Sequence, residues 1–187
     1  GHAGTLDPLA TGVLIVCTGK HTKKINQFMD LPKEYVTTID FSHVSTTDDG
    51  EGIITKVVVD KKPSKEELLA ALKVFTGEIL QVPPKYSAIK IQGRVAYKMA
   101  RNGETFIMPP RQVSVYSIEL ISYEWPLCTI KIACSKGTYI RSLGADIGKE
   151  LQVGGYLTKL ERTAIGEFTV SQAIDLATFL KSEDPLP

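Results

Sequence analysis

The sequence predicts an α+β domain built on a mixed, largely antiparallel sheet that helices flank. Strand patterns come in runs and hairpin pairs interrupted by single helices, whereas a doubly wound parallel sheet would alternate the two. Two long strand patterns, at residues 112–125 and 127–135, follow each other as the arms of a hairpin do. No repeat at solenoid periods is present. With 187 residues, 43% of them hydrophobic, the chain is long enough to bury one sizeable core.

Short elements and a polar loop are expected in the first third of the chain. The apolar run at residues 13–17 predicts a buried strand. Residues 20–30 predict a short helix, because apolar residues recur at i, i+3 and i+4 and a proline follows. β-branched and aromatic residues predict strands at residues 33–41 and 53–59. The Ser, Thr, Asp and Gly residues of segment 42–52 predict a polar loop between them.

A capping box begins the next helix. Ser64 is the expected N-cap and Glu67 the N3 residue, and Gly77 lies just past the helix end. The apolar residues of this helix suit packing on a sheet. A short strand is expected at residues 78–82, before two prolines, and a strand-like segment at residues 86–92.

The second half predicts a short helix at residues 94–102 and then the two long strands. The second long strand carries apolar residues on one face and polar or small residues on the other, as in a half-solvated antiparallel strand. Its apolar face consists of Cys128, Ile130, Ile132 and Cys134. Thr138 is the expected N-cap of a helix that runs to Leu151, and a strand is expected at residues 156–163.

The chain end predicts one more helix, at residues 171–180. We expect residues 1–180 to form one domain. Residues 181–187, which contain two prolines and two acidic residues, are expected to be a tail or linker.

Composition excludes some classes of protein. No apolar stretch is long enough to span a membrane, and no signal-peptide pattern is present. The cysteines are Cys17, Cys128 and Cys134; the last two lie on one strand, roughly 20 Å apart at about 3.3 Å per residue, too far for a disulfide. Reduced, buried thiols in a cytosolic protein are therefore expected. The scattered histidines show no zinc-ligand spacing.

The net charge of +1 is low for a free-standing RNA-binding protein. Basic residues nevertheless gather in one segment, opposed only by Glu104; they are Lys85, Lys90, Arg94, Lys98, Arg101 and Arg111. Such a patch can follow a phosphate backbone. From charge alone, a solvated helix face is an equally good interpretation.

The most distinctive stretch is the loop at residues 1–14, GHAGTLDPLATGVL. Asp7 is the one acidic residue before Asp30, and the proline after it biases its backbone toward an extended conformation. A lone carboxylate on a glycine-framed loop is a candidate catalytic group. A structural role, in which Asp7 closes an Asx turn, agrees equally well with these residues alone.

This loop closely resembles the catalytic loop of the TruB family of tRNA pseudouridine synthases. The aspartate of the family's LDP triplet is catalytic, which implies that role for Asp7. Four further segments resemble the family in order and spacing: KEY at 33–35, PPKYSAIK at 83–90, CSKGTYIR at 134–141 and GYLTKLERT at 155–163. The resemblance implies the pseudouridine synthase fold with a central active-site cleft across the sheet. It also implies a fragment of the catalytic domain, without the N-terminal segment and the C-terminal PUA domain of bacterial members.

The resemblance implies roles for single residues as well. Arg141 would pair with Asp7, although its helix position alone would make it a surface residue. Tyr35 would contact the target base by stacking, which contributes about 1–3 kcal/mol per base. More commonly, a tyrosine at such a position in a strand is half-buried and only structural. Leu160 would line the base pocket.

Further contacts follow from the same motifs. Tyr139 and His2 are assigned to the base pocket, although a lone histidine can also simply stabilise a loop. Contacts to RNA phosphates are assigned to Lys85, Lys90 and Lys136 of the matched segments and to Arg94 of the basic segment. Glu161 stands where many family members carry arginine, so no phosphate contact is assigned there.

The implied reaction converts uridine 55 in the tRNA T loop to pseudouridine. It breaks the N1–C1′ bond and forms a C5–C1′ bond without net gain or loss of atoms, so no cofactor or metal is expected. The target base must leave its stack to reach the enzyme. Residue types do not decide whether Asp7 attacks C1′, adds to C6 or removes the 2′ proton. We expect a monomeric cytoplasmic enzyme whose partner is the T arm of tRNA.

Two other functions compete with this interpretation. An RNA-binding or RNA-folding chaperone module would use the same basic segment and leave Asp7 as a spectator. A glycosidase is disfavoured, because such enzymes usually need two carboxylates and no second one accompanies Asp7 in the matched segments.

Overall fold

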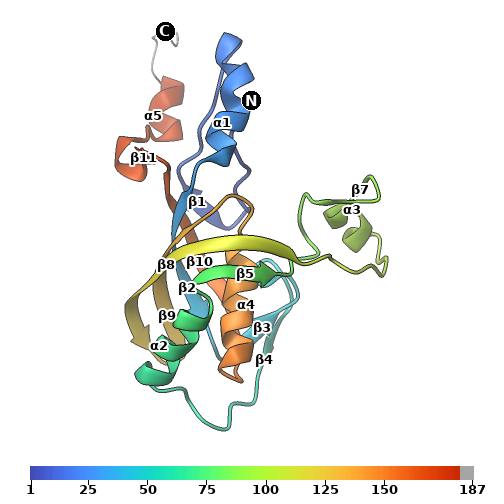
Figure 1. Cartoon of the computed structure of the whole chain (residues 1–187), viewed down its shortest axis with the longest axis vertical. Coiled ribbons are helices and arrows are strands. Elements are labelled where there is room, and N and C mark those ends of the chain that lie inside the picture. Colours follow the sequence, from blue (N-terminus) through green and yellow to red (C-terminus); the bar gives the residue numbers. More distant parts are fainter. Residues whose placement is uncertain (182–187) are drawn as a thin grey trace.

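The structure, a computed structural model, describes residues 1–181. Within these residues a seven-stranded sheet has the order β1-β10-β2-β9-β8-β5, and β11 pairs with β10 (Figure 1). The pairing of β1 with β10 is parallel and the other pairings are antiparallel, so the predicted α+β class is confirmed. The strands of this sheet are β1 (Ala10–Gly12), β2 (Lys33–Asp40), β5 (Gly77–Gln81), β8 (Arg111–Glu124), β9 (Leu127–Cys134), β10 (Tyr156–Ile165) and β11 (Phe168–Thr169).

The remaining elements are short helices and two small hairpins. The hairpins pair β3 (His43–Ser45) with β4 (Ile54–Lys56) and β6 (Lys90–Ile91) with β7 (Arg94–Val95). The α-helices are α1 (Ile25–Asp30), α2 (Lys65–Val74), α3 (Ala96–Arg101), α4 (Ile140–Glu150) and α5 (Leu176–Lys181), and the 3₁₀ helices are η1 (Gly19–Lys24) and η2 (Val170–Gln172).

The core lies between the sheet and helices α2 and α4, which cover the same face (Figure 1). The alternation of β9 turns its predicted apolar face inward, and all four of its residues are fully buried. Leu68 and Leu72 of α2 and Leu143 and Ile147 of α4 pack against them. Burying one such side chain contributes about 1.5–3 kcal/mol, so this contact fixes α4 on the sheet. Its first turn, which contains Arg141, is therefore rigidly placed.

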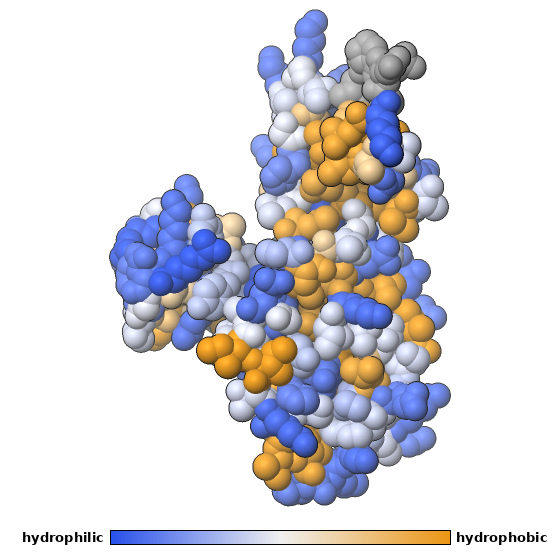
Figure 2. Space-filling view, turned by 180° about the vertical axis from the view of Figure 1, so that it is seen from behind, coloured by the Kyte–Doolittle hydropathy of each residue, from blue (hydrophilic) through white to orange (hydrophobic). Residues whose placement is uncertain are grey.

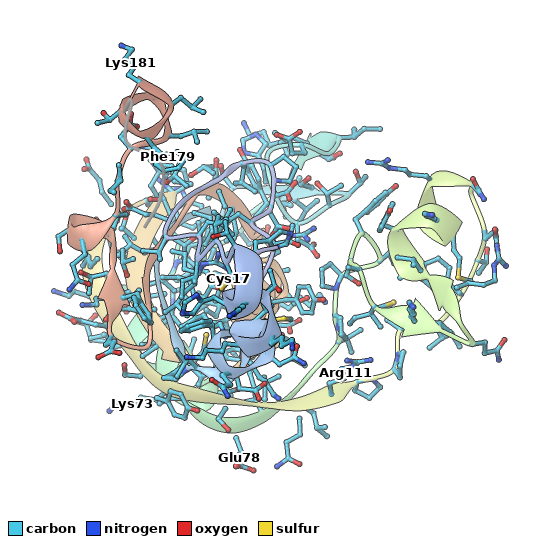
Figure 3. All side chains as sticks on the ribbon, turned by 90° about the horizontal axis from the view of Figure 1, so that it is seen from above. Cys17, Lys73, Glu78, Arg111, Phe179 and Lys181 are labelled. Atoms are coloured by element: carbon cyan, nitrogen blue, oxygen red, sulfur yellow. The ribbon has the colours of Figure 1, made fainter. Side chains whose placement is uncertain are left out.

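Residues 82–110, which we call the arm, project from the sheet between β5 and β8 (Figure 1). They contain the β6–β7 hairpin and α3, packed around a small apolar cluster of Ile89, Ala96 and Met108. Tyr139, just before α4, packs on this cluster and so ties the arm to the main body. Seen from above, Arg111 lies where the chain returns from the arm into the sheet (Figure 3).

Helices α1 and α5 both lie at the end of the molecule remote from α2 (Figure 1). Here the rings of Phe28 in α1 and Phe168 in β11 meet edge to face, with centroids 5.7 Å apart. Apolar side chains remain at the surface of this end (Figure 2), among them Ile174 and Leu176, which are 70% and 68% exposed.

Several predicted elements are confirmed within a residue or two. These are the strands at 33–41, 112–125, 127–135 and 156–163, and the helices at 20–30 and 94–102. The capping box of Ser64 and Glu67 is present at the start of α2. All three cysteines are buried and free, as expected. None of the helices in the described part of the chain is long and apolar enough to cross a membrane.

Other predictions are wrong. The strand lies at Ala10–Gly12 rather than at 13–17, where the chain makes only an isolated bridge between His2 and Val16. The loop at 42–52 begins with β3, and the strand at 53–59 shrinks to β4. Segment 86–92 is strand only at β6.

The start of α4 also differs from the prediction, because Thr138 is not its N-cap. The hydroxyl of Thr138 donates back to Ser135 O at 3.0 Å, and Tyr139 occupies the N-cap position without a side-chain cap. The last predicted helix is divided into η2 and α5. The predicted tail at 181–187 lies, apart from its first residue, outside the described residues.

Candidate active site

The loop that carries Asp7 is closed at its base by its own backbone. Gly1 N donates to Cys17 O and Cys17 N donates to Gly1 O, both at 2.8 Å, and Ala3 N donates to Ile15 O. At the tip, Ala10 N donates to Asp7 O at 2.9 Å and turns the chain into β1. Asp7 therefore lies at the entrance of a tight turn beside the edge of the sheet.

Arg162 on β10 binds this loop through hydrogen bonds to two of its backbone carbonyls. Its side chain is buried, and it donates from Nε to Val13 O at 2.8 Å and from Nη2 to Gly4 O at 3.1 Å. Gly12 crosses the backbone of Arg162 so closely that a Cβ there would lie 2.2 Å from Arg162 O. Gly4 and Gly12 both have positive φ, near +100°, which glycine adopts at little cost. The glycines of the motif thus let the loop lie against Arg162.

The structure brings Asp7 and Arg141 together across 134 residues of sequence. Arg141 donates from Nε to Asp7 Oδ2 at 2.9 Å and from Nη2 to Asp7 Oδ1 at 3.0 Å. Such a bidentate pair fixes the plane of the carboxylate as well as its position. Within residues 1–181 the Asp7 carboxylate accepts from Arg141 and from no backbone N–H, so the Asx-turn interpretation of Asp7 does not apply. The Arg141 side chain is 5% exposed and that of Asp7 34%, which leaves the carboxylate accessible from solvent.

A second carboxylate, Asp49, approaches the same Nε of Arg141. Its Oδ2 is 3.6 Å from Arg141 Nε, and its side chain is 4% exposed. Asp49 Oδ1 also accepts from the Thr47 hydroxyl and from Glu51 N. Asp49 is thus a buried counter-charge, and its burial argues against a role as the second acid of a glycosidase. Asp49 lies outside the matched segments, so the family motifs did not predict its contact with Arg141.

Two backbone carbonyls complete the surroundings of the guanidinium. Arg141 Nη1 donates to Thr47 O at 3.2 Å, and Nη2 donates to Tyr86 O at 3.1 Å in addition to Asp7. Contacts from three separate segments therefore orient one buried cation. Arg141 is not the surface residue that its helix position alone would suggest.

Tyr35 and Leu160 lie on the two strands next to the loop. Tyr35 on β2 is half-buried against the core and pairs in register with Arg162. Burial raises the pKa of the Tyr35 phenol, and the nearby Arg162 opposes that rise. Leu160 on β10 is buried and pairs with Ala10, three residues after Asp7. Leu160 thus lies beside the strand that follows the Asp7 loop, and Tyr35 beside Arg162, which binds that loop. The roles assigned to both residues remain predictions.

A hollow of about 300 Å³ adjoins this region, lined in part by Leu9, Thr11 and Leu160. Asp7 and Tyr35 are not among its lining residues. A larger hollow of about 520 Å³ lies between α2 and the end of α4, at the far end of that helix from Arg141. Neither hollow is the predicted central cleft.

The other two residues assigned to the base pocket differ in their surroundings. Tyr139 is half-buried against the arm, and burial raises the pKa of its phenol. Ser87 and the charge of Arg111 oppose that rise, and the charges of Arg141 and Asp7 have smaller effects on the same pKa. His2 is exposed, and its ring makes no hydrogen bond with the described residues. Its backbone bridges Val16 at the base of the loop.

The assigned phosphate-binding residues are all exposed. Arg94 is paired with Glu104 at 2.5 Å and Lys136 with Asp30 at 2.7 Å, so neither is a free cation. Lys85 and Lys90 make no ion pair within the part of the chain that the structure describes. These two lysines of the arm therefore suit an incoming phosphate better than the other two. Among residues 1–181 no group of three or more His, Cys, Asp or Glu side chains is placed to hold a metal.

The comparison with known proteins identifies the family of this chain. Over residues 1–140 the sequence matches the family described as TruB family pseudouridylate synthase (N terminal domain). The chain belongs to this family. It is 46% identical over 179 residues to tRNA pseudouridine synthase B of Bacteroides fragilis, covering 96% of this chain and 77% of the relative. The tRNA pseudouridine synthase B of Saccharophagus degradans is 45% identical, and there the chain spans 57% of the relative's length.

Solved structures show the same TruB-type architecture. A Cbf5-Nop10-Gar1 complex contains a chain with a TM-score of 0.68 and 30% identity, covering 90% of this chain and 41% of that one. An H/ACA RNP bound to a substrate RNA containing 2'-deoxyuridine gives a TM-score of 0.63 at 28% identity, covering 90% and 39%. The predicted fold family is therefore confirmed.

Three residues with clear positions in this TruB site were missed in the sequence. Asp49 contacts Arg141, and Arg162 contacts the Asp7 loop. Gln81 contacts the turn before α4. Arg162 lies inside the matched segment 155–163, so its polar character in a strand was an available signal. Asp49 lay in a predicted loop among other polar residues, and nothing in its spacing distinguished it.

Proposed function

We propose that this chain is the catalytic part of an isomerase that converts uridine to pseudouridine at position 55 in the T loop of tRNA. The observation that carries the proposal is the bidentate pair of Asp7 with the buried Arg141, in a loop of the TruB family. The names of its relatives support tRNA as the substrate. The cytoplasm is the compartment that goes with that substrate.

The reaction needs one carboxylate beside the ribose and base of a single nucleotide. The N1–C1′ bond breaks, the uracil turns, C5 bonds to C1′, and the C5 proton is lost while N1 gains one. Asp7 is held by Arg141 with its carboxylate plane fixed and one side open to solvent. A fixed carboxylate meets the reacting atoms without reorganising, which is a large part of enzymatic rate enhancement.

The neighbouring residues suit the extruded base. The uridine must leave its stack, and the enzyme must replace the lost contacts. The half-buried ring of Tyr35 offers a stacking surface, and Leu160 an apolar wall. Tyr139 lies two residues before Arg141, at the N-cap of α4, and packs on the apolar cluster of the arm.

The arm is the proposed contact for the T arm of the tRNA. Lys85 and Lys90 are exposed on it and free for phosphates. Each phosphate contact releases counterions, so binding should weaken as salt rises. A monomer suffices for this arrangement, because all the named site residues come from one chain.

The substrate is tested with tRNA transcripts. The intact protein is incubated with a transcript that contains uridine 55 and with one that carries cytidine there, and pseudouridine is mapped by position. The proposal expects modification at position 55 of the first transcript and none elsewhere in either. Faster tRNA folding without pseudouridine would instead support the chaperone alternative and overturn the isomerase.

A further inference from the structure

Gln81, the last residue of β5, is fully buried and binds the turn before α4 in two directions. Its Nε2 donates to Tyr139 O at 3.0 Å, and its Oε1 accepts from Tyr139 N at 2.7 Å. Tyr139 is the N-cap residue of α4 and has no side-chain cap of its own. The first N–H groups of a helix lack intrahelical partners. A side chain from a strand 58 residues away therefore satisfies the backbone just ahead of Arg141.

Two more bonds join the same two segments. The Ser142 hydroxyl donates to Val82 O at 2.8 Å, and Arg141 Nη2 donates to Tyr86 O at 3.1 Å. The start of α4 is thus bonded to three points along the root of the arm. Figure 1 shows β5 crossing the start of α4 at the place where the arm leaves the sheet. Across the ladder, Gln81 pairs with Arg111, where the chain returns from the arm.

We propose that Gln81 is a positioning residue for the reaction: it sets the turn Tyr139–Arg141 so that Arg141 meets Asp7 bidentately. This inference rests on the proposed function. Gln81 does not contact Asp7 or Arg141, and acts through the backbone two residues before Arg141. A guanidinium that must align two nitrogens with two oxygens is sensitive to small shifts of its own backbone.

The geometry favours this role over simple filling of the core. An apolar residue at position 81 would fill the same space but leave Tyr139 N and O without these partners. The turn would then shift toward other partners, and Arg141 would move with it. A misplacement of about 1 Å at a catalytic group can cost about 100-fold in rate.

The test compares Gln81→Leu and Gln81→Glu with the wild type in the intact protein. The first removes both bonds. The second keeps the size and the acceptor but replaces the donor by a buried carboxylate oxygen that faces Tyr139 O. The matched control is Gln112→Leu, because Gln112 lies on β8 opposite Leu80 with its side chain exposed. Pseudouridine formation is measured in single turnover with saturating enzyme, and tRNA binding is measured separately.

We expect the single-turnover rate to fall roughly 30-fold for Gln81→Leu and at least as much for Gln81→Glu, with the tRNA Kd within about threefold of wild type. The control should remain at the wild-type rate. An unchanged rate in both Gln81 variants, or a loss explained wholly by weaker tRNA binding, would overturn the proposal.

A double-mutant cycle separates positioning from a general structural role. If Gln81 acts through Arg141, Gln81→Leu should cost less than about threefold in an Arg141→Lys background. The same factor in both backgrounds would contradict it. A crystal structure of Gln81→Leu should show the two-point contact between Arg141 and Asp7 broken, and an intact contact would refute the inference. Failure of the proposed function would show differently, as a wild-type protein that forms no pseudouridine.

Discussion

Arg141 and Asp7 form a two-point contact in which Nε meets Oδ2 and Nη2 meets Oδ1, at 2.9 and 3.0 Å. The guanidinium is buried, whereas the carboxylate remains partly open. The buried guanidinium therefore orients a carboxylate that solvent can reach. This arrangement depends on the planar shape of the arginine side chain as well as on its charge.

Replacing Arg141 by lysine keeps the charge but removes this shape. An ammonium cannot bind both oxygens in one plane, nor reach Thr47 O and Tyr86 O at the same time. We expect Arg141→Lys to lower the single-turnover rate by about 100-fold or more. Arg101→Lys, on the exposed end of α3, is the control: it keeps the charge of the basic segment, and its single-turnover rate at saturating enzyme should equal that of the wild type. A lysine variant with near wild-type turnover would show that charge alone suffices.

Asp49 is expected to affect both stability and the reaction rate through its contact with Arg141. Asp49→Asn keeps the size and removes the negative charge 3.6 Å from Arg141 Nε. Loss of a buried partner charge should lower the free energy of unfolding by about 1–3 kcal/mol, and the rate by about tenfold if Arg141 then shifts. Urea unfolding and single-turnover kinetics measure the two effects. Asp60→Asn, at an exposed position, is the control; equal behaviour of the two variants would refute the role given to Asp49.

Gly12 is expected to be irreplaceable by alanine. The new Cβ would lie 2.2 Å from Arg162 O, and the backbone has a φ of +101°. We expect Gly12→Ala to destabilise the fold by about 2 kcal/mol or more and to displace the Asp7 loop. Gly50→Ala is the matched control, because a Cβ there meets nothing within 4 Å. Thermal unfolding compares the two, and a Gly12→Ala protein as stable as the control would contradict this account of the loop.

Alkaline pH should destabilise the protein through its buried thiols. Burial raises the pKa of the Cys128 thiol from 9.0 to about 12. The folded state therefore keeps this proton above pH 9 while the unfolded state loses it, so the contribution is complete below pH 9 and is lost as pH rises toward 12. The slope is roughly 1.4 kcal/mol per pH unit in that window.

This slope is measured by urea unfolding between pH 7.5 and 10.5 in the presence of a reducing agent. Cys128→Ala will be less stable at neutral pH because of the cavity. Its free energy of unfolding should nevertheless fall less steeply above pH 9 than that of the wild type. Parallel curves for the two proteins would show that the thiol titrates normally.

The sequence predicted the parts of the fold that depend on local pattern. The β8–β9 hairpin follows from long alternating runs, and α2 from the capping box of Ser64 and Glu67. The strand predicted from the apolar run at 13–17 is wrong, because hydrophobicity alone does not show which backbone segment pairs with another strand. Residues 10–12 reach the edge of β10, whereas Val16 points to solvent and is 64% exposed.

The site was predicted as far as the family motifs extend. Asp7 and Arg141 stand in matched segments, and the structure pairs them. Asp49 and Gln81 reach the site through contacts made only after folding, over 92 and 58 residues of sequence from Arg141 and Tyr139. Neither residue type is unusual in its own segment, so no local pattern could distinguish them.

The central claim is that Asp7 performs the chemistry, and tritium release tests it most directly. The intact protein and its Asp7→Asn variant are incubated with a tRNA transcript that carries tritium at C5 of uridine, and tRNA binding is measured in parallel. The account predicts release by the wild type, none by Asp7→Asn, and tRNA Kd values within about threefold of each other. Tritium release by Asp7→Asn at a rate near that of the wild type would contradict it.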